Sequence, residues 1–235
     1  MNRSERLHAL LLGAFLALLP VAGAADTIAV IGTGSVGGAL GPEFAALGHR
    51  IVYGSREPDR DEVRALVART GGDASATTPA DAVRDAEFVV LAVPGELAPS
   101  IAAGLGDLAG KILIDPTNAL RRGDDGNFEM TVATSNAELI QAAAPGAHVV
   151  KAFNTLNWRT MVDPDSAGGP VTIPLVGDDA DAKARVAALV EGLGLEAIDL
   201  GPLRYARHVE GMLVVWINNR YNGGLSFDYH LRPNP

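Results

Sequence analysis

A glycine-rich turn between a short apolar run and a helical segment constrains the fold of this chain more than any other feature. Residues 27–31 are mostly apolar and rich in β-branched side chains, as in a buried parallel strand. Gly32, Gly34 and Gly37 follow with the spacing G-x-G-x-x-G, and residues 35–47 read as a helix. The first glycine permits a tight turn, the second admits a pyrophosphate, and the third lets the helix pack closely. The pattern predicts a dinucleotide site.

The end of the next predicted strand indicates which dinucleotide the site binds. Residues 51–54 form a second apolar run, and Ser55 and Arg56 follow it where NAD-binding proteins usually carry Asp or Glu. A guanidinium can grip a ribose 2′-phosphate with two charge-assisted hydrogen bonds, whereas a carboxylate would repel it. Arg60, which follows Arg56, and Thr33, which lies in the glycine loop, can add further contacts to this phosphate. We therefore predict that the cofactor is NADP(H).

Other interpretations of these two segments stay open. Glu57 would oppose a phosphate, and we expect its side chain to point outward. Arg56 can also be a solvated surface arginine, and the glycine turn can serve packing alone.

Composition excludes several classes of function. The chain has 235 residues, a net charge of −9 and no basic run, which argues against a nucleic-acid partner. It has no cysteine, so disulfides, thiolate nucleophiles and Cys-ligated metals are excluded. Its five histidines show no metal-ligand spacing, and we expect no metal site.

The first 24 residues have the pattern of a secretory signal peptide. Two arginines precede an apolar stretch at residues 9–19, and Ala22-Gly23-Ala24 is a small-residue cleavage pattern. We expect an exported, periplasmic protein with no membrane span after cleavage. Two alternatives are an uncleaved anchor and a misassigned start codon, with a cytoplasmic protein that begins near Val21.

The remainder of the chain alternates strand and helix patterns. Further strands are predicted at residues 74–77, 87–93, 111–115, 147–151, 171–176 and 195–200. Helices are predicted at residues 61–69, 135–144, 178–193 and 203–221, a short helix begins at residues 78–81, and a loop carries Asn157 and Trp158. The carboxyl ends of strands line the ligand crevice in an open α/β sheet, so we expect Ala92, Val93 and Pro94 near the cofactor and Asn118 at the next strand end.

These elements predict an α/β fold, a Rossmann doubly wound and mostly parallel sheet with a small C-terminal α/β lobe. Residues 25–152 are expected to form the NADP-binding Rossmann domain. Residues 153–235 are expected to form the smaller lobe, which would supply an acceptor cleft and, through the helix at 203–221, a possible dimer interface.

Five segments resemble, in the same order, those of the NADPH-dependent deazaflavin (coenzyme F-420) reductases. They are residues 32–37, 54–56, 92–94, 115–118 and 149–155, and the Lys-Ala-Phe-Asn-Thr run in the last is the most specific. The oxidoreductase domain of STEAP-type metalloreductases is similar. The resemblance implies a Rossmann domain with a small C-terminal lobe, often dimeric.

The resemblance also implies residue roles. It implies 2′-phosphate contacts at Thr33, Ser55, Arg56 and Arg60. It implies a nicotinamide environment at Val93, Pro94, Asn154 and Thr155. Deazaflavin reductases tend to have histidine where this chain has Asn154, and a small residue where it has Trp158, so a deazaflavin, a flavin or another small acceptor all stay open.

The sequence therefore predicts an oxidoreductase that moves a hydride between NADP(H) and a flavin-like or other small acceptor, and that acts as a homodimer. The predicted cofactor-binding residues are Gly32, Thr33, Gly34, Ser35, Val36, Gly37, Ser55, Arg56, Arg60, Ala92, Val93, Pro94, Asn118, Asn154 and Thr155. No catalytic residue is assigned, because direct hydride transfer needs no protein nucleophile.

Three residues have open roles. Lys151 can orient a phosphate or acceptor, or form a structural ion pair. Asn118 and Asn154 can bond the carboxamide or acceptor ring, or hold their own loops. Two other functions also stay open. One is a non-catalytic NADP-binding sensor or partner module, in which Trp158 and Tyr205 would fill the acceptor cleft. The other is an imine or oxo-acid reductase of the pyrroline-carboxylate type.

Overall fold

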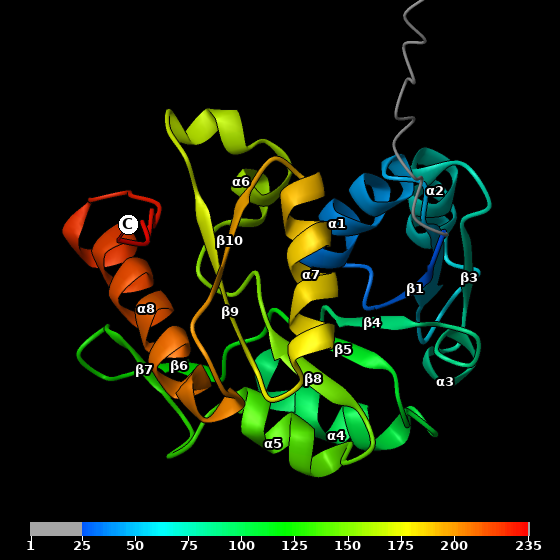
Figure 1. The fold of residues 1–235 in the computed structure, drawn as a ribbon, viewed down its shortest axis with the longest axis horizontal. Helices are drawn as coiled ribbons and strands as arrows, with labels where there is room; N and C mark the ends of the chain where they lie inside the picture. Colours follow the sequence, from blue (N-terminus) through cyan, green and yellow to red (C-terminus); the bar gives the residue numbers. More distant parts are fainter. Residues whose placement is uncertain (1–24, 235) are drawn as a thin grey trace, which may run out of the picture.

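The computed structural model describes residues 25–234, so the predicted signal segment lies outside the described residues. One eight-stranded sheet runs through this part of the chain (Figure 1). Its strands, in spatial order, are β10 (Glu196–Asp199), β9 (Thr172–Gly177), β8 (His148–Lys151), β5 (Ile112–Asp115), β4 (Phe88–Leu91), β1 (Thr27–Ile31), β2 (Arg50–Gly54) and β3 (Ser75–Thr77). The mostly parallel sheet confirms the predicted Rossmann class.

Helices cover both faces of the sheet, and each face has its own apolar core. The helices on one face are α1 (Ser35–Ala46), α2 (Asp61–Thr70), α6 (Trp158–Val162) and α7 (Ala180–Gly192). Those on the other face are α3 (Pro79–Ala82), α4 (Ala98–Gly104), α5 (Asn136–Ala143) and α8 (Ala206–Asn218). In β1, Ile28 and Val30 enter the first core while Ala29 and Ile31 enter the second. Burial on both faces explains why this strand is a continuous apolar run.

The direction of the sheet changes after β8. Strands β1, β2, β3, β4, β5 and β8 are parallel, whereas β9 pairs antiparallel with β8, Val150 opposite Gly177, and β10 is parallel to β9. The C-terminal strands thus continue the same sheet. The division of the chain at residue 152 into two domains stays a prediction.

Helix boundaries follow local capping chemistry. Ser135 Oγ accepts from the backbone N–H of Glu138, and Asp179 Oδ1 accepts from that of Ala182, as N-caps do. Thr78 caps α3 in the same way. The predicted helix at 203–221 is divided into a 3₁₀ turn at Leu203–Tyr205, α8, and a π-helical turn at Asn219–Gly223.

Helix α4, a hairpin and helix α6 are not predicted from the sequence. A hairpin of β6 (Leu120–Arg122) and β7 (Phe128–Met130) lies against α8, where Asn218 accepts from Phe128 N at 2.7 Å and donates to Phe128 O at 2.8 Å. Its three-residue strands are too short to show a clear alternation. The predicted loop around residue 158 contains α6, which Asn157 caps by accepting from Arg159 N.

Helix α1 packs closely on β2 because Gly41 has no side chain. A Cβ at Gly41 would lie 2.0 Å from the hydroxyl oxygen of Tyr53, which is fully buried. Burial raises the pKa of Tyr53, so its hydroxyl stays protonated and pairs with Thr70 Oγ1 at 2.8 Å.

We expect Gly41→Ala to lower the free energy of unfolding by about 1–3 kcal/mol, because the new methyl group overpacks this contact. Gly104→Ala is the matched control at the end of α4, where a Cβ meets nothing within 4 Å. It should leave stability unchanged or raise it by up to about 1 kcal/mol. Chemical denaturation measures both values, and equal stability of the two variants would contradict the packing argument.

Candidate functional site

The glycine loop between β1 and α1 is shaped by close backbone contacts. Gly32 has φ +104°, and a Cβ there would lie 2.1 Å from the carbonyl oxygen of Ala92. A Cβ at Gly37 would lie 2.1 Å from Gly32 O. A Cβ at Gly34, in contrast, meets nothing within 4 Å. The outer glycines are therefore required by packing, while the middle one leaves open space at the amino end of α1, where backbone amides favour an anion.

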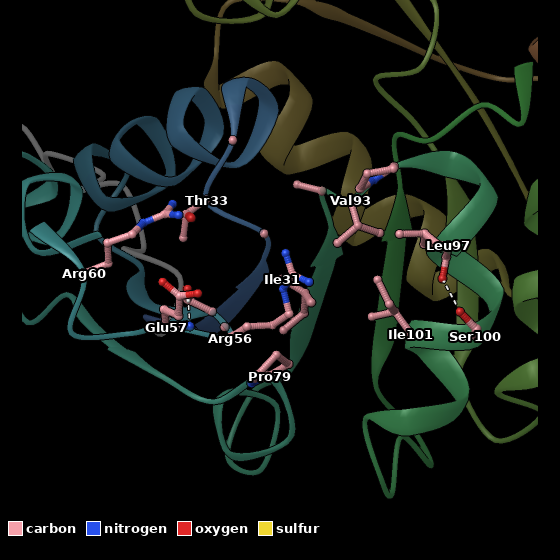
Figure 2. A pocket seen from close by; sticks show the side chains of 16 residues that line it. Ile31, Thr33, Arg56, Glu57, Arg60, Pro79, Val93, Leu97, Ser100 and Ile101 are labelled. Carbon is pink, nitrogen blue, oxygen red and sulfur yellow. Dashed lines mark hydrogen bonds between the residues drawn. The ribbon is translucent and has the colours of Figure 1, made fainter. Parts of the chain in front are cut away.

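A cavity of about 460 Å³ opens at this loop (Figure 2). This volume lies within the range of small-molecule sites. Nine predicted residues line it, namely Gly32, Thr33, Gly34, Ser55, Arg56, Arg60, Ala92, Val93 and Pro94. Figure 2 shows Thr33, Arg56 and Arg60 on one side and Val93, Leu97 and Ile101 on the other.

The cationic side of the cavity is built on the turn after β2. Arg56 and Arg60 are exposed, and Arg60 Nε lies 3.1 Å from Glu62 Oε2. Ser55 Oγ accepts from the backbone N–H of Glu57 at 3.2 Å, which leaves the hydroxyl proton free to donate to a ligand. The same bond folds the turn back on itself. Glu57 consequently lines the cavity, and the expectation that it points away from the site is wrong.

The opposite wall of the cavity is largely apolar and is not predicted from the sequence. Leu97, Ser100 and Ile101, at and just before the start of α4, line it, whereas Pro79 of α3 lies against Gly54 beside the cationic side. Ser100 Oγ bonds the carbonyl of Leu97, so this wall presents mainly aliphatic groups. Leu97 is 48 % exposed, so its side chain is accessible to a ligand in the cavity.

The remaining six predicted residues do not line the cavity. Ser35, Val36 and Gly37 form the first turn of α1, and Thr155 is buried. Asn118 and Asn154 lie beyond Pro94, at the ends of β5 and β8.

The two asparagines are bonded to each other. Asn154 Nδ2 donates to Asn118 Oδ1 at 3.0 Å and to the carbonyl of Val209 at 3.2 Å, and Asn118 Nδ2 donates to Asn154 O at 3.2 Å. Val209 O can only accept, which fixes the orientation of the Asn154 amide. Asn154 Oδ1 is buried and meets no donor among the described residues. Phe153, directly before it, has φ +63°, a strained conformation for a buried aromatic residue.

Lys151 forms a buried ion pair. Its ammonium lies 2.8 Å from Asp115 Oδ2 and 2.7 Å from Glu210 Oε1, and all three side chains are fully buried. Of the two roles left open for Lys151, the structure shows the structural ion pair.

Trp158 and Tyr205 do not line the cavity. Trp158 packs against the first core beside α1, with the Arg159 guanidinium 4.5 Å from its ring centre. Tyr205 is 41 % exposed next to His208. Within residues 25–234, no group of three or more His, Cys, Asp or Glu residues is arranged to hold a metal ion.

Similarity to known proteins assigns this chain to the class of NADP-dependent oxidoreductases. The sequence model of the family described as NADP oxidoreductase coenzyme F420-dependent matches residues 27–119. A solved structure from Arthrobacter sp. FB24, assigned as an F420-dependent NADP-reductase, is 34 % identical, with a TM-score of 0.79 and coverage of 88 % of this chain and 100 % of that one. The chain belongs to the coenzyme F420-dependent NADP oxidoreductase family.

Two further relatives support this assignment. The F420-dependent NADP reductase of Methanothermobacter thermautotrophicus is 29 % identical over 206 residues, which cover 81 % of this chain and 88 % of that protein. The metalloreductase STEAP3 of Rattus norvegicus is 30 % identical over 189 residues, or 80 % of this chain. The match spans 36 % of the length of STEAP3.

We expect Arg56→Ala to weaken NADPH binding by ~2 kcal/mol and NADH binding far less, because a charged hydrogen bond to the 2′-phosphate is lost. Arg64→Ala is the matched control, since Arg64 is exposed, pairs with Asp61 and does not line the cavity. Titration of each variant with both cofactors by calorimetry measures the difference. Equal losses for NADPH and NADH would overturn the assignment of Arg56.

The two kinds of loop glycine should respond differently to substitution. Gly34→Val adds side-chain atoms where a Cβ meets nothing, so the melting temperature should stay near that of the wild type while NADPH binding is lost. Gly37→Ala places a methyl group against the loop backbone, so both should fall. Thermal denaturation with and without NADPH separates the two cases. Tight NADPH binding by Gly34→Val would show that the pyrophosphate lies elsewhere.

Proposed function

We propose that this protein transfers a hydride between NADP(H) and a flavin-like acceptor, either a deazaflavin or a flavin. The observation that carries the proposal is the cavity, in which an open glycine loop, two cations and an apolar wall converge. Membership of the family supports the cofactor, and the names of the relatives from Arthrobacter and Methanothermobacter support a deazaflavin acceptor.

The residues present fit the adenosine half of NADP(H). Thr33, Ser55, Arg56 and Arg60 would hold the 2′-phosphate, and the open space at Gly34 would take the pyrophosphate. The adenine would lie along the apolar wall opposite the cations. Glu57 lies beside this site, and its carboxylate would favour the monoanionic over the dianionic form of the bound 2′-phosphate.

The residues beyond Pro94 fit the nicotinamide half. The buried Asn154 Oδ1 has no donor among the described residues, and a carboxamide N–H would satisfy it. The nicotinamide of the cofactor supplies the hydride when it is bound. The chain itself would orient the ring, through Val93, Pro94 and the asparagine pair, and exclude water from it.

A second candidate function is a non-catalytic NADP-binding sensor. It is favoured by the closure of the nicotinamide region, because Asn154 is 2 % exposed and its amide is bonded to Asn118 and Val209. A sensor would bind the adenosine half in the open cavity without admitting an acceptor.

Deuterium transfer distinguishes the two functions. With NADPH deuterated at nicotinamide C4, we expect the label at C5 of a reduced deazaflavin, because that carbon does not exchange its hydrogen with water. Mass spectrometry of the product measures it, and FMN, FAD and ferric salts are parallel acceptors followed by NADPH oxidation. Tight NADPH binding without turnover of any acceptor would favour the sensor.

We also propose that the protein is a homodimer that pairs through α8. Val215 on this helix is 54 % exposed, and Tyr221 and Leu225 after it are 65 % and 56 % exposed. Met212, Leu213 and Val214, directly before Val215, are apolar and half-buried, so apolar side chains remain accessible along this helix. Light scattering of the purified protein gives the mass that decides the proposal of a homodimer.

Among residues 25–234, no helix is long and apolar enough to cross a membrane.

We propose, finally, that the protein is exported and that residues 1–24 are removed. The charged, apolar and small-residue segments of this region support the proposal. An exported enzyme must obtain NADPH outside the cytoplasm. Cell fractionation with N-terminal sequencing tests both points, and an intact cytoplasmic chain would contradict them.

A further inference from the structure

The fully buried ion cluster of Lys151, Asp115 and Glu210 has no part in binding the cofactor as described above. Two carboxylates face one ammonium, so the cluster carries one excess negative charge. The amino end of α5 offsets it, because Glu210 accepts from the backbone amides of Asn136 at 3.0 Å and Ala137 at 3.2 Å. The cluster thereby joins β5, β8, α5 and α8.

Stability alone is a weak reason for such a cluster. Burial of an ion pair sets a large desolvation penalty against the attraction, and apolar replacements are often neutral or stabilising. A buried ionic cluster does, however, favour one arrangement of the elements that carry it. The contribution of this cluster therefore lies in the positions of the residues attached to it.

The cluster lies directly behind the asparagine pair. Asp115 is three residues before Asn118, Lys151 is three residues before Asn154, and Glu210 follows Val209, whose carbonyl accepts from Asn154. Two bridges thus run side by side from α8 to the strand ends, one ionic and one through the amides. The Lys151 ammonium also donates to Thr117 O, next to Asn118.

We infer that Glu210 is a positioning residue for hydride transfer, which it supports by holding α8 and both strand ends in the register that sets the Asn118–Asn154 pair. This inference rests on the proposed function. Glu210 does not touch the adenosine cavity, so its effect should fall on the hydride step and not on cofactor affinity.

The test compares Glu210→Met with Lys183→Met. Glu210→Met removes the link from α8 but leaves Lys151 and Asp115 as a balanced pair. Lys183→Met breaks another ion pair of a buried lysine, with Asp199 at 2.8 Å, whose side chain is 54 % exposed; this pair joins α7 to β10, away from the asparagines. Both variants should melt at a lower temperature than the wild type.

Glu210→Met should lower kcat by about tenfold or more, because small displacements at the reacting centre have large effects on rate. The dissociation constant of NADPH should stay within about twofold, since the adenosine cavity is unchanged. Lys183→Met should keep kcat within about twofold of the wild type. Glu210→Gln, which retains the length and an acceptor oxygen, should recover part of kcat, and it replaces Glu210→Met if that variant does not fold.

A second readout needs no turnover. Side-chain amide hydrogens of Asn118 and Asn154, followed by NMR, should exchange with water about tenfold faster in Glu210→Met than in the wild type or Lys183→Met. If the wild type turns over no acceptor, the proposed function fails and amide exchange alone decides this inference. Unchanged exchange, or a kcat equal to that of Lys183→Met, would overturn the positioning role.

Discussion

A close backbone approach in the site, between the glycine loop and Ala92 directly after β4, is the constraint on which the rest of the structure depends. A methyl group on Gly32 would lie 2.1 Å from Ala92 O, so only glycine allows this approach. The contact places the amino end of α1, the turn after β2 and the start of α4 around one cavity. Gly41, in the middle of α1, allows this helix to pack closely on Tyr53 of β2.

The two halves of the site have different physical characters. The half proposed to bind the adenosine is open and carries the exposed cations Arg56 and Arg60. The half proposed to hold the nicotinamide is closed by bonds among Asn118, Asn154 and Val209, with a strained Phe153 and a buried ion cluster behind it. The first half would therefore supply most of the affinity for the cofactor, and the second would control the hydride step. Glu210 connects α8 to this second half through the ion cluster.

Sequence reasoning predicted the parts of the structure that local patterns determine. The strand, glycine turn and helix from residue 27, the helices that begin near Ser135 and Asp179, and the strand ends near Pro94 all depend on neighbours in the sequence. Sequence reasoning failed where contacts between residues distant in the sequence determine the structure. The hairpin at residues 120–130 is held by Asn218, ninety positions away, and the wall formed by Leu97 and Ile101 is defined only by what it faces. Lys151 could not be assigned because Glu210 is distant in sequence.

The central claim is that this cavity recognises an adenosine that carries a 2′-phosphate. Calorimetric titration with 2′,5′-ADP and with 5′-ADP tests it most directly, since the two ligands differ only in that phosphate and need no acceptor or hydride step. The account predicts that 2′,5′-ADP binds at least about tenfold more tightly, with an advantage that shrinks as salt is raised. Equal affinity for the two ligands would contradict it.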